Sequence, residues 1–363
     1  MTIWKSNLIL SDIPWDYYLH PCPKFYGLEL AKHGVTIWIN PPTRNPYKVR
    51  IIRASKNLIV FTPWMFARSL KVVGFSRLEV RLQIRLIAKF LLKQVSSIWS
   101  ISTAYNFLIW DFPLARSIFW SGDFFDPISE LKSYKEFDLV LCLTPKKFEG
   151  IPLSYKGKKI HFNMSCDLNI FNENHNEKNI CEQFSRFTSN DSKIVGYIGT
   201  LSSRRVNYLI IEKLIEICPN LNFIFIGKRD GLESTNNDVE KIIQRDNVLI
   251  LENIDYIEIP NYLNLIDVCI IPYLINSANV GTCPNKFVEY CSVGKPIIST
   301  MLPGLTKFAD LACFGSSAED FSSLIHKVLG SNRDNQMKLQ KKFAENSSAS
   351  NFLIEIRKIL QKH

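Results

Sequence analysis

The chain has 363 residues, of which 46% are hydrophobic and 21% charged, a composition typical of globular proteins and not of disordered or collagen-like chains. No apolar run reaches the roughly 20 residues that span a bilayer, and no signal-peptide core precedes Asp12, so we expect a cytoplasmic protein. The net charge is +10, and residues 1–175 carry all of it, with 23 Lys and Arg against 13 Asp and Glu. A basic half joined to a neutral half predicts an anionic partner, such as nucleic acid, an anionic membrane surface or a phosphorylated substrate.

The first half alternates short β-branched or aromatic runs with longer amphipathic stretches. We predict strands at 8–10, 35–39, 58–61, 97–99, 117–120, 139–143 and 159–162, and helices at 24–33, 75–95 and 127–135. This alternation predicts an α/β domain over residues 1–175. The polar stretch 172–190 is predicted to be a linker.

The second half shows the same rhythm more clearly. We predict strands at 193–199, 221–227, 248–251, 267–271 and 296–300, and helices at 207–218, 238–245, 259–265 and 285–293. Strands that alternate with helices in this way indicate βαβ units and a parallel sheet. The predicted fold class is α/β: two doubly wound Rossmann-like domains, 1–175 and 176–345, face each other across a cleft. Residues 346–363 are predicted to hold a final helix that could return to the first domain.

The stretch 272–300 holds the strongest functional signal. A strand end leads into a loop of small polar residues, and a helix is predicted to start at Pro284, a favoured first position. The N-terminus of such a helix offers free N–H groups to phosphate. Lys286 and Glu289 share one helix face, where a cation near phosphate and a carboxylate near ribose hydroxyls would hold a sugar nucleotide. The local chemistry alone also fits a surface ion pair on an ordinary helix.

The same stretch resembles a known family. The run PNKFVEY at 284–290, followed by GKP at 294–296, is similar to the PxKxxEY donor-site signature of GT-B glycosyltransferases. The resemblance is to the family-4-like group of polysaccharide-assembly enzymes, including teichuronic-acid and xanthan-type glycosyltransferases. The strands that end at Gly199 and Gly227 resemble the first two strands of the donor-binding domain of that group.

The resemblance implies a set of nucleotide-sugar-binding residues in the second domain. They are Gly199, Thr200, Arg205, Tyr256, Asn279, Thr282, Lys286 and Glu289. Glu289 would bind the ribose hydroxyls, and the nucleobase would lie at Tyr256, which could equally be a packed surface aromatic. Arg205 and Lys286 would stabilise the leaving diphosphate, so we predict no metal ion and no other cofactor. The donor is expected to be a UDP-sugar, with a GDP-sugar as the alternative.

The catalytic base is sought in the first half, because attack by a sugar hydroxyl requires a group that accepts its proton. Asp123 follows a strand whose sequence resembles the segment in which xanthan-type glucuronosyltransferases place a catalytic aspartate. Its structural alternative is a helix-capping or loop carboxylate. Asp16 and His20 are further candidates, in a loop that resembles the acceptor-side loop of the family. Gly281 stands where many retaining members carry a glutamate, so the resemblance leaves the anomeric outcome open.

The predicted helix over 75–95 carries basic residues at every fourth position among many apolar ones. The basic residues are Arg77, Arg81, Arg85, Lys89 and Lys93. Such a basic amphipathic helix is typical of interfacial membrane anchors, and we expect it to face the anionic inner leaflet. The alternative is a core helix whose solvated face is basic.

These patterns together predict a hexosyltransferase-type enzyme on the cytoplasmic face of the inner membrane. It would move a sugar from a nucleotide-diphosphate sugar to a lipid-linked or saccharide acceptor of a bacterial capsule, O-antigen or exopolysaccharide. Two alternatives stay open: a non-catalytic GT-B-like binding subunit, and a sugar-nucleotide epimerase on the same fold. Nucleic-acid binding is disfavoured, because the basic residues alternate with Leu, Ile and Phe on a helix rather than with exposed aromatics on strands.

Overall fold

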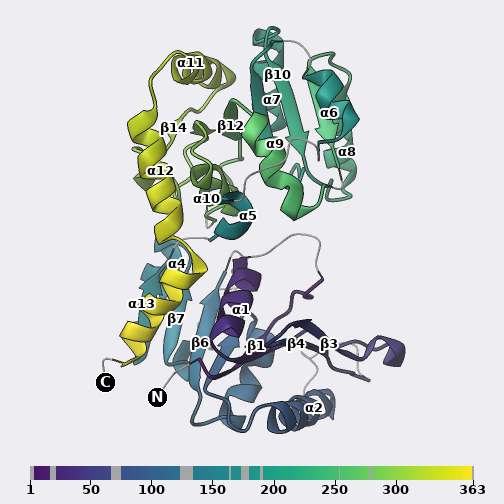
Figure 1. The fold of residues 1–363 in the computed structure, drawn as a ribbon, viewed down its shortest axis with the longest axis vertical. Coiled ribbons are helices and arrows are strands. Elements are labelled where there is room, and N and C mark those ends of the chain that lie inside the picture. Colours follow the sequence, from purple (N-terminus) through teal and green to yellow (C-terminus); the bar gives the residue numbers. More distant parts are fainter. Residues whose placement is uncertain are drawn as a thin grey trace. The chain divides into compact units, whose positions relative to one another are not determined.

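The chain folds into two α/β units in a computed structural model (Figure 1). The structure describes residues 4–16, 22–66, 75–122, 134–162, 165–172, 180–188, 191–252, 254–277, 279–280 and 282–361. The first unit comprises residues 1–163 and 349–363, and the second comprises residues 164–348. The predicted boundary at 175 is therefore too late, because α5 (Leu168–Asn172) packs against α10 (Asn285–Ser292) of the second unit.

The sheet of the first unit has the strand order β3-β4-β2-β1-β5-β6-β7-β8. Its strands are β1 (Ser6–Leu10), β2 (Val35–Ile39), β3 (Arg50–Ser55), β4 (Leu58–Thr62), β5 (Ser97–Ser100), β6 (Arg116–Ser121), β7 (Leu139–Cys142) and β8 (Lys158–His161). All neighbouring pairs are parallel except β3 with β4. The strands β2, β4 and β3 lie on one side of β1, with β3 at the edge of the sheet. The next strand in the chain, β5, lies on the other side of β1. The order thus reverses between β1 and β5.

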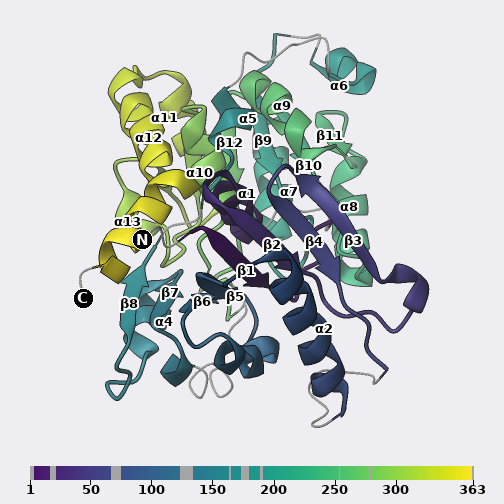
Figure 2. The ribbon, with the colours of Figure 1, turned by 60° about the horizontal axis from the view of Figure 1, so that its bottom comes forward.

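Helices cover both faces of this sheet. They are α1 (Cys22–His33), α2 (Phe75–Leu91), α4 (Pro145–Gly150) and α13 (Ala349–Gln361), with short 3₁₀ helices η1 (Pro46–Lys48), η2 (Thr103–Asp111) and η3 (Tyr134–Glu136). Figure 2 shows α2 beside β4 and β2, and its residues Val80, Ile84 and Ala88 enter the core under that face. The opposite face is aromatic, since Trp120 contacts Tyr26 of α1 at a ring-centroid distance of 4.8 Å.

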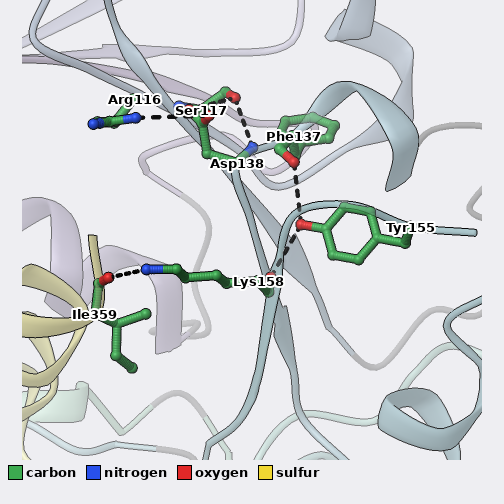
Figure 3. Close-up of polar contacts among 7 residues, drawn as sticks. All are labelled: Arg116, Ser117, Phe137, Asp138, Tyr155, Lys158 and Ile359. Carbon is green, nitrogen blue, oxygen red and sulfur yellow. Dashed lines mark hydrogen bonds and ion pairs between the residues drawn. The ribbon is translucent and has the colours of Figure 1, made fainter. Parts of the chain in front are cut away.

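The C-terminal helix α13 belongs to the first unit. It packs against α1, and the Lys158 ammonium on β8 donates a hydrogen bond to the carbonyl oxygen of Ile359 (Figure 3). The Tyr155 hydroxyl donates to the carbonyl oxygen of Phe137 at 3.1 Å and to that of Lys158 at 3.0 Å, and so holds the segment that leads into β8. The last residues of the chain therefore complete the unit that its first residues begin.

The sheet of the second unit has the order β11-β10-β9-β12-β13-β14, and every neighbouring pair is parallel. Its strands are β9 (Ile194–Ile198), β10 (Asn222–Ile226), β11 (Val248–Leu251), β12 (Val268–Ile271), β13 (Ile297–Ser299) and β14 (Cys313–Phe314). Its further helices are α6 (Glu182–Phe187), α7 (Tyr208–Ile217), α8 (Glu233–Ile243), η5 (Tyr256–Glu258), α9 (Ile259–Leu265), η6 (Thr306–Phe308), α11 (Ala318–Leu329) and α12 (Asp334–Asn346). The strands β9 and β12 are neighbours in this sheet although they are not consecutive in the chain, so the strand order reverses between them.

Several elements differ from the sequence prediction. The edge strand β3 was not predicted, because most of its residues are exposed and its pattern lacks a buried face. The helices α11 and α12 were also missed. Part of the predicted linker over 172–190 is the helix α6. Most of the predicted helix over 127–135 lies outside the described residues.

Candidate functional site

The site is built around α10, which lies at the carboxyl-end side of the second sheet. Pro284 is the residue before the helix, with extended backbone angles, so the helix begins at Asn285 rather than at Pro284 as predicted. Residues 286–292 are all buried. Lys286 is 7% exposed and Glu289 8%, so the two side chains are not a surface ion pair. A sheet of this type binds ligands beyond the carboxyl ends of its strands, where the order reverses.

The Lys286 ammonium lies between two tyrosines from the strands that flank this reversal. Its Nζ donates to the hydroxyl of Tyr197 on β9 at 2.9 Å and to that of Tyr273, just after β12, at 2.6 Å. Nζ is also 4.1 Å and 4.7 Å from the two ring centroids, a cation–π arrangement. Burial acts to raise the pKa of Tyr273, but the charge and hydrogen bond of Lys286 outweigh it and lower that pKa.

The charge of this ammonium is not balanced by an ion pair within the described residues. Among the residues that the structure describes, no carboxylate forms an ion pair with Lys286, whose hydrogen bonds go to neutral hydroxyls. A buried charge is costly unless an opposite charge or sufficient hydrogen bonds compensate it. The position is therefore suited to an anionic ligand group.

Two glycines give the ammonium its room. Gly199 follows β9 with φ 148°, and a side chain there would overlap Nζ and Cε of Lys286. Gly227 follows β10 with φ 152°, and a side chain there would overlap the carbonyl oxygen of Gly199. Both backbone conformations are ones that residues with a Cβ rarely adopt. A side chain at either glycine would therefore crowd the surroundings of Lys286, and the contact of Gly199 with a ligand stays a prediction.

Glu289 lies one helical turn after Lys286 and is bonded to Tyr256. The Tyr256 hydroxyl donates to Glu289 Oε1 at 3.0 Å. Burial raises the pKa of Glu289 to about 7, and the Tyr256 hydrogen bond and the Lys286 charge limit the rise. Tyr256 thus orients this carboxylate, and its contact with a nucleobase stays a prediction. Near neutral pH the ionised form can accept hydrogen bonds from ligand hydroxyls.

The remaining predicted residues form the loops around α10. Asn279 Nδ2 donates to the carbonyl oxygens of Arg205 at 3.0 Å and Leu274 at 2.8 Å, and Thr282 Oγ1 donates to that of Asn279 at 2.9 Å. Asn279 and Thr282 are buried, so they shape the loop, and their contact with phosphate stays a prediction. The carbonyl oxygen of Thr200 accepts from the Tyr197 hydroxyl at 2.9 Å.

Arg205 is the second cation of the site. Its guanidinium forms no ion pair with any described residue, and its charge contributes to lowering the pKa of Tyr273. Lys286 and Arg205 therefore act on the same tyrosine. Asn207, which follows the Arg205 segment, caps α7 by accepting from the backbone N–H of Ile210.

The predicted catalytic residues of the first unit are placed only in part. Asp123 and His20 lie outside the described residues. Asp16 is exposed, and its Oδ2 lies 2.5 Å from Nη2 of Arg50. Asp16 is thus held in a surface ion pair, and its role as a base stays a prediction.

The predicted basic stripe of α2 is partly neutralised. Asp111 accepts two hydrogen bonds from Arg81, at 2.7 and 2.6 Å, and lies 3.6 Å from Arg85. Arg77 lies over the ring of Phe107. Lys89 is in the last turn, whereas Lys93 follows the helix, because α2 ends at Leu91 and not at 95. Four apolar side chains on one face of the helix are exposed: Leu78, Leu82, Leu86 and Phe90. We call them the α2 apolar row.

Comparisons with known proteins identify relatives of the chain. Residues 192–330 match the family model described as Glycosyl transferases group 1. The second unit contains a group 1 glycosyl transferase domain. Over 151 residues the chain is 29% identical to the putative teichuronic acid biosynthesis glycosyltransferase TuaH of Bacillus subtilis (strain 168). The match covers 40% of this chain and 37% of the length of that protein.

Solved structures show the fold of the whole chain. A glycosyltransferase from Rickettsia africae matches with a TM-score of 0.74 and 14% identity, over 99% of each chain. Anabaena Alr3699/HepE, solved in complex with UDP and glucose, matches with a TM-score of 0.68 and 12% identity, over 99% of this chain and 100% of that one. The chain therefore has the predicted GT-B fold, with two α/β units built on largely parallel sheets.

Sequence reasoning missed the two tyrosines that hold the key cation of the group 1 domain. Tyr197 lies in a run that reads only as a buried strand, and Tyr273 comes directly after Pro272 at the next strand end. The signal that could have found them is the strand order, which places the ends of β9 and β12 side by side. No helix among the described residues is both long and apolar enough to cross a membrane.

Proposed function

We propose that this protein is a hexosyltransferase-type glycosyltransferase that takes its sugar from a nucleotide-diphosphate donor. The observation that carries the proposal is the buried Lys286 ammonium at the reversal point of the second sheet, which forms no ion pair with a carboxylate of the described residues. A diphosphate group supplies the missing negative charge. The neighbouring Glu289 is placed to accept hydrogen bonds from the ribose hydroxyls.

The proposed chemistry needs stabilisation of the leaving group. As the bond from the anomeric carbon to phosphate breaks, negative charge develops on the nucleoside diphosphate. Lys286 and Arg205 would stabilise that charge, which is the task that a divalent cation performs in other enzymes, and we propose that the reaction is metal-independent. A UDP-sugar is the favoured donor, consistent with the fold shared with a protein solved with UDP and glucose.

The donor site is tested by replacing Glu289. Glu289→Ala should weaken UDP binding by about 2–3 kcal/mol, because hydrogen bonds to a charged acceptor contribute this much. Isothermal titration calorimetry with UDP measures the effect. The exposed Glu216, in the same unit, provides the control, and Glu216→Gln should bind UDP as the parent does. UDP affinity that is unaltered in Glu289→Ala would refute the donor-site assignment.

We further propose a lipid-linked or saccharide acceptor in the synthesis of a bacterial surface polysaccharide. The support is the similarity of part of the chain to a protein named for teichuronic acid biosynthesis. The excess positive charge of residues 1–175 supports contact with an anionic surface. We place this contact at the cytoplasmic face of the inner membrane.

The surface proposed for the membrane is the α2 apolar row together with the exposed Lys89 and Lys93. Phe90 is 87% exposed and Leu86 67%, whereas the core contacts of the helix come from Val80, Ile84 and Ala88. Apolar side chains flanked by cations fit the boundary between anionic headgroups and acyl chains. Because Asp111 already binds Arg81, the apolar row rather than the arginines carries this interaction.

The membrane proposal predicts salt-sensitive binding that depends on the apolar row. The parent should sediment with phosphatidylglycerol vesicles at low salt and much less at high salt, since screening shortens the range of the attraction. Leu86→Ser with Phe90→Ser should weaken vesicle binding by about tenfold or more, given the value of burying such side chains. Leu153→Ser, which changes another fully exposed leucine of the same unit, should have little effect. A parent that does not bind these vesicles at any salt concentration would exclude the proposal.

A further inference from the structure

The first sheet has its own reversal point, between β1 and β5. These two strands are parallel and adjacent, with Leu10 paired to Ser100, and the backbone N–H of Ile101 donates to the carbonyl oxygen of Leu10 at 2.9 Å. Beyond this pair the chain turns away from β1 and β5 towards different elements. The general rule for open α/β sheets therefore places a second ligand site at this position.

A carboxylate and a hydroxyl meet there. Asp12 lies two residues after Leu10, the last residue of β1, and Ser102 lies two residues after Ser100, the last residue of β5, at the start of η2. The Ser102 hydroxyl is hydrogen-bonded to the Asp12 carboxylate, and Ser102 Oγ also accepts from the backbone N–H of Ala104 at 3.2 Å. Ser102 is the cap of η2, so its side chain has a fixed position.

The surroundings of Asp12 leave its carboxylate able to accept a hydrogen bond from a ligand. Asp12 is partly exposed beyond the end of β1, and burial raises its pKa, an effect that its hydrogen bonds to the backbone and to Ser102 limit. Asp12 forms no ion pair with any described residue, unlike Asp16, which binds Arg50. The nearby Tyr105 is buried, and its hydroxyl donates to the carbonyl oxygen of Asn40 at 3.1 Å. Among the described residues, no cation pairs with the Asp12 carboxylate.

We propose that Asp12 and Ser102 form the binding site for the attacking hydroxyl of the acceptor, with Asp12 as its base. The inference rests on the function proposed above. The acceptor hydroxyl gives its proton to the Asp12 carboxylate as its oxygen bonds to the anomeric carbon of the donor. The bond from that carbon to the phosphate oxygen breaks, and the nucleoside diphosphate leaves with the electron pair. Asp12 then releases the proton to water.

The proposed donor site and this site differ in the sign of their charge. The reversal point of the second sheet presents the Lys286 ammonium, and that of the first presents the Asp12 carboxylate. A cation suits a diphosphate, and an unpaired carboxylate suits a neutral, hydroxyl-bearing ligand that donates hydrogen bonds. A base is most effective when its pKa is closer to the working pH than that of an ordinary aspartate.

The test measures UDP release from UDP-glucose, with n-octyl glucoside as acceptor and with water alone. Asp12→Asn should lower the rate with n-octyl glucoside by about 10²- to 10⁴-fold, the usual contribution of a general base, while UDP affinity in calorimetry stays as in the parent. Asp12→Glu should recover part of the lost rate, because it retains a carboxylate. Ser102→Ala should show a smaller loss, since Ser102 only positions Asp12. Glu149→Gln, which changes an exposed carboxylate of the same unit, should behave as the parent.

The outcomes separate the two proposals. If the parent binds UDP and releases it from UDP-glucose, but Asp12→Asn keeps near-parent rates, the inference on Asp12 is wrong and the proposed function stands. If the parent neither binds UDP nor turns over UDP-glucose, the proposed function fails and the inference fails with it. Loss of UDP affinity in Asp12→Asn would indicate a general structural change and would also overturn the assigned role.

Discussion

Replacing Gly227 by alanine should destabilise the second unit by about 3 kcal/mol and strongly weaken UDP binding. Two costs add: the strain of a non-glycine residue at φ 152°, and the overlap of its Cβ with the carbonyl oxygen of Gly199. The obstacle is backbone rather than the end of a flexible side chain, so Gly199 must move. Because Gly199 borders the Lys286 ammonium, its displacement disturbs the proposed diphosphate site.

Gly231 provides the matched control for this prediction. It also has a positive φ, 78°, but an added Cβ would meet no atom within 4 Å. Gly231→Ala should therefore carry the conformational cost alone, about 1 kcal/mol, and leave UDP affinity unchanged. Urea denaturation and calorimetry measure both quantities. If the two substitutions lower the free energy of unfolding and the UDP affinity by the same amounts, the contact between Gly227 and Gly199 contributes to neither quantity.

Replacing Glu289 by glutamine should stabilise the protein at pH 8 by about 3 kcal/mol, which corresponds to the rise of the Glu289 pKa from 4.5 to about 7. Below pH 4.5 the carboxyl is protonated in both the folded and the unfolded state, so parent and variant should be equally stable. Between pH 4.5 and 7 the unfolded state releases the proton first, and the parent loses stability as the pH rises. Above pH 7 the full penalty remains.

The same substitution should weaken UDP binding at pH 8, because the proposed ribose contact uses the ionised carboxylate. The parent should bind UDP less tightly as the pH falls through 7, and Glu289→Gln should show a much flatter profile. Denaturation curves and calorimetry across pH 4.5 to 8.5 give both results. Parallel stability profiles for parent and variant would contradict the raised pKa, and a gain in UDP affinity would contradict the assigned role.

The parts of the fold that the sequence predicted are those with strong local patterns. The strand β11 and the helix α9 were predicted with the bounds that the structure shows. The helix α12 was missed because it is rich in charged residues, and its place depends on Phe343, whose ring meets that of Phe287 at 5.8 Å. Such a contact between distant segments leaves little periodic signal in the chain.

The residues of the candidate site also fall into those that a local sequence pattern predicts and those that only the strand order brings together. The spacing of Lys286 and Glu289 along one helix predicted that they would lie together, and they do. Their partners Tyr197, Tyr256 and Tyr273 come from three other elements, brought together by the order of the strands in the second sheet. Asp12 was not singled out for the same reason, since its importance follows only from the adjacency of β1 and β5.

The division of the chain into units has a consequence for synthesis on the ribosome. The second unit is continuous, residues 164–348, so all its contacts can form as soon as that stretch has emerged. The first unit must wait for α13, which covers Tyr26 and stacks Phe352 on Phe162 at 5.1 Å. Until then an aromatic surface stays uncovered. The unit that begins first is thus completed last, and the nascent chain is most vulnerable to aggregation just before its final helix is made.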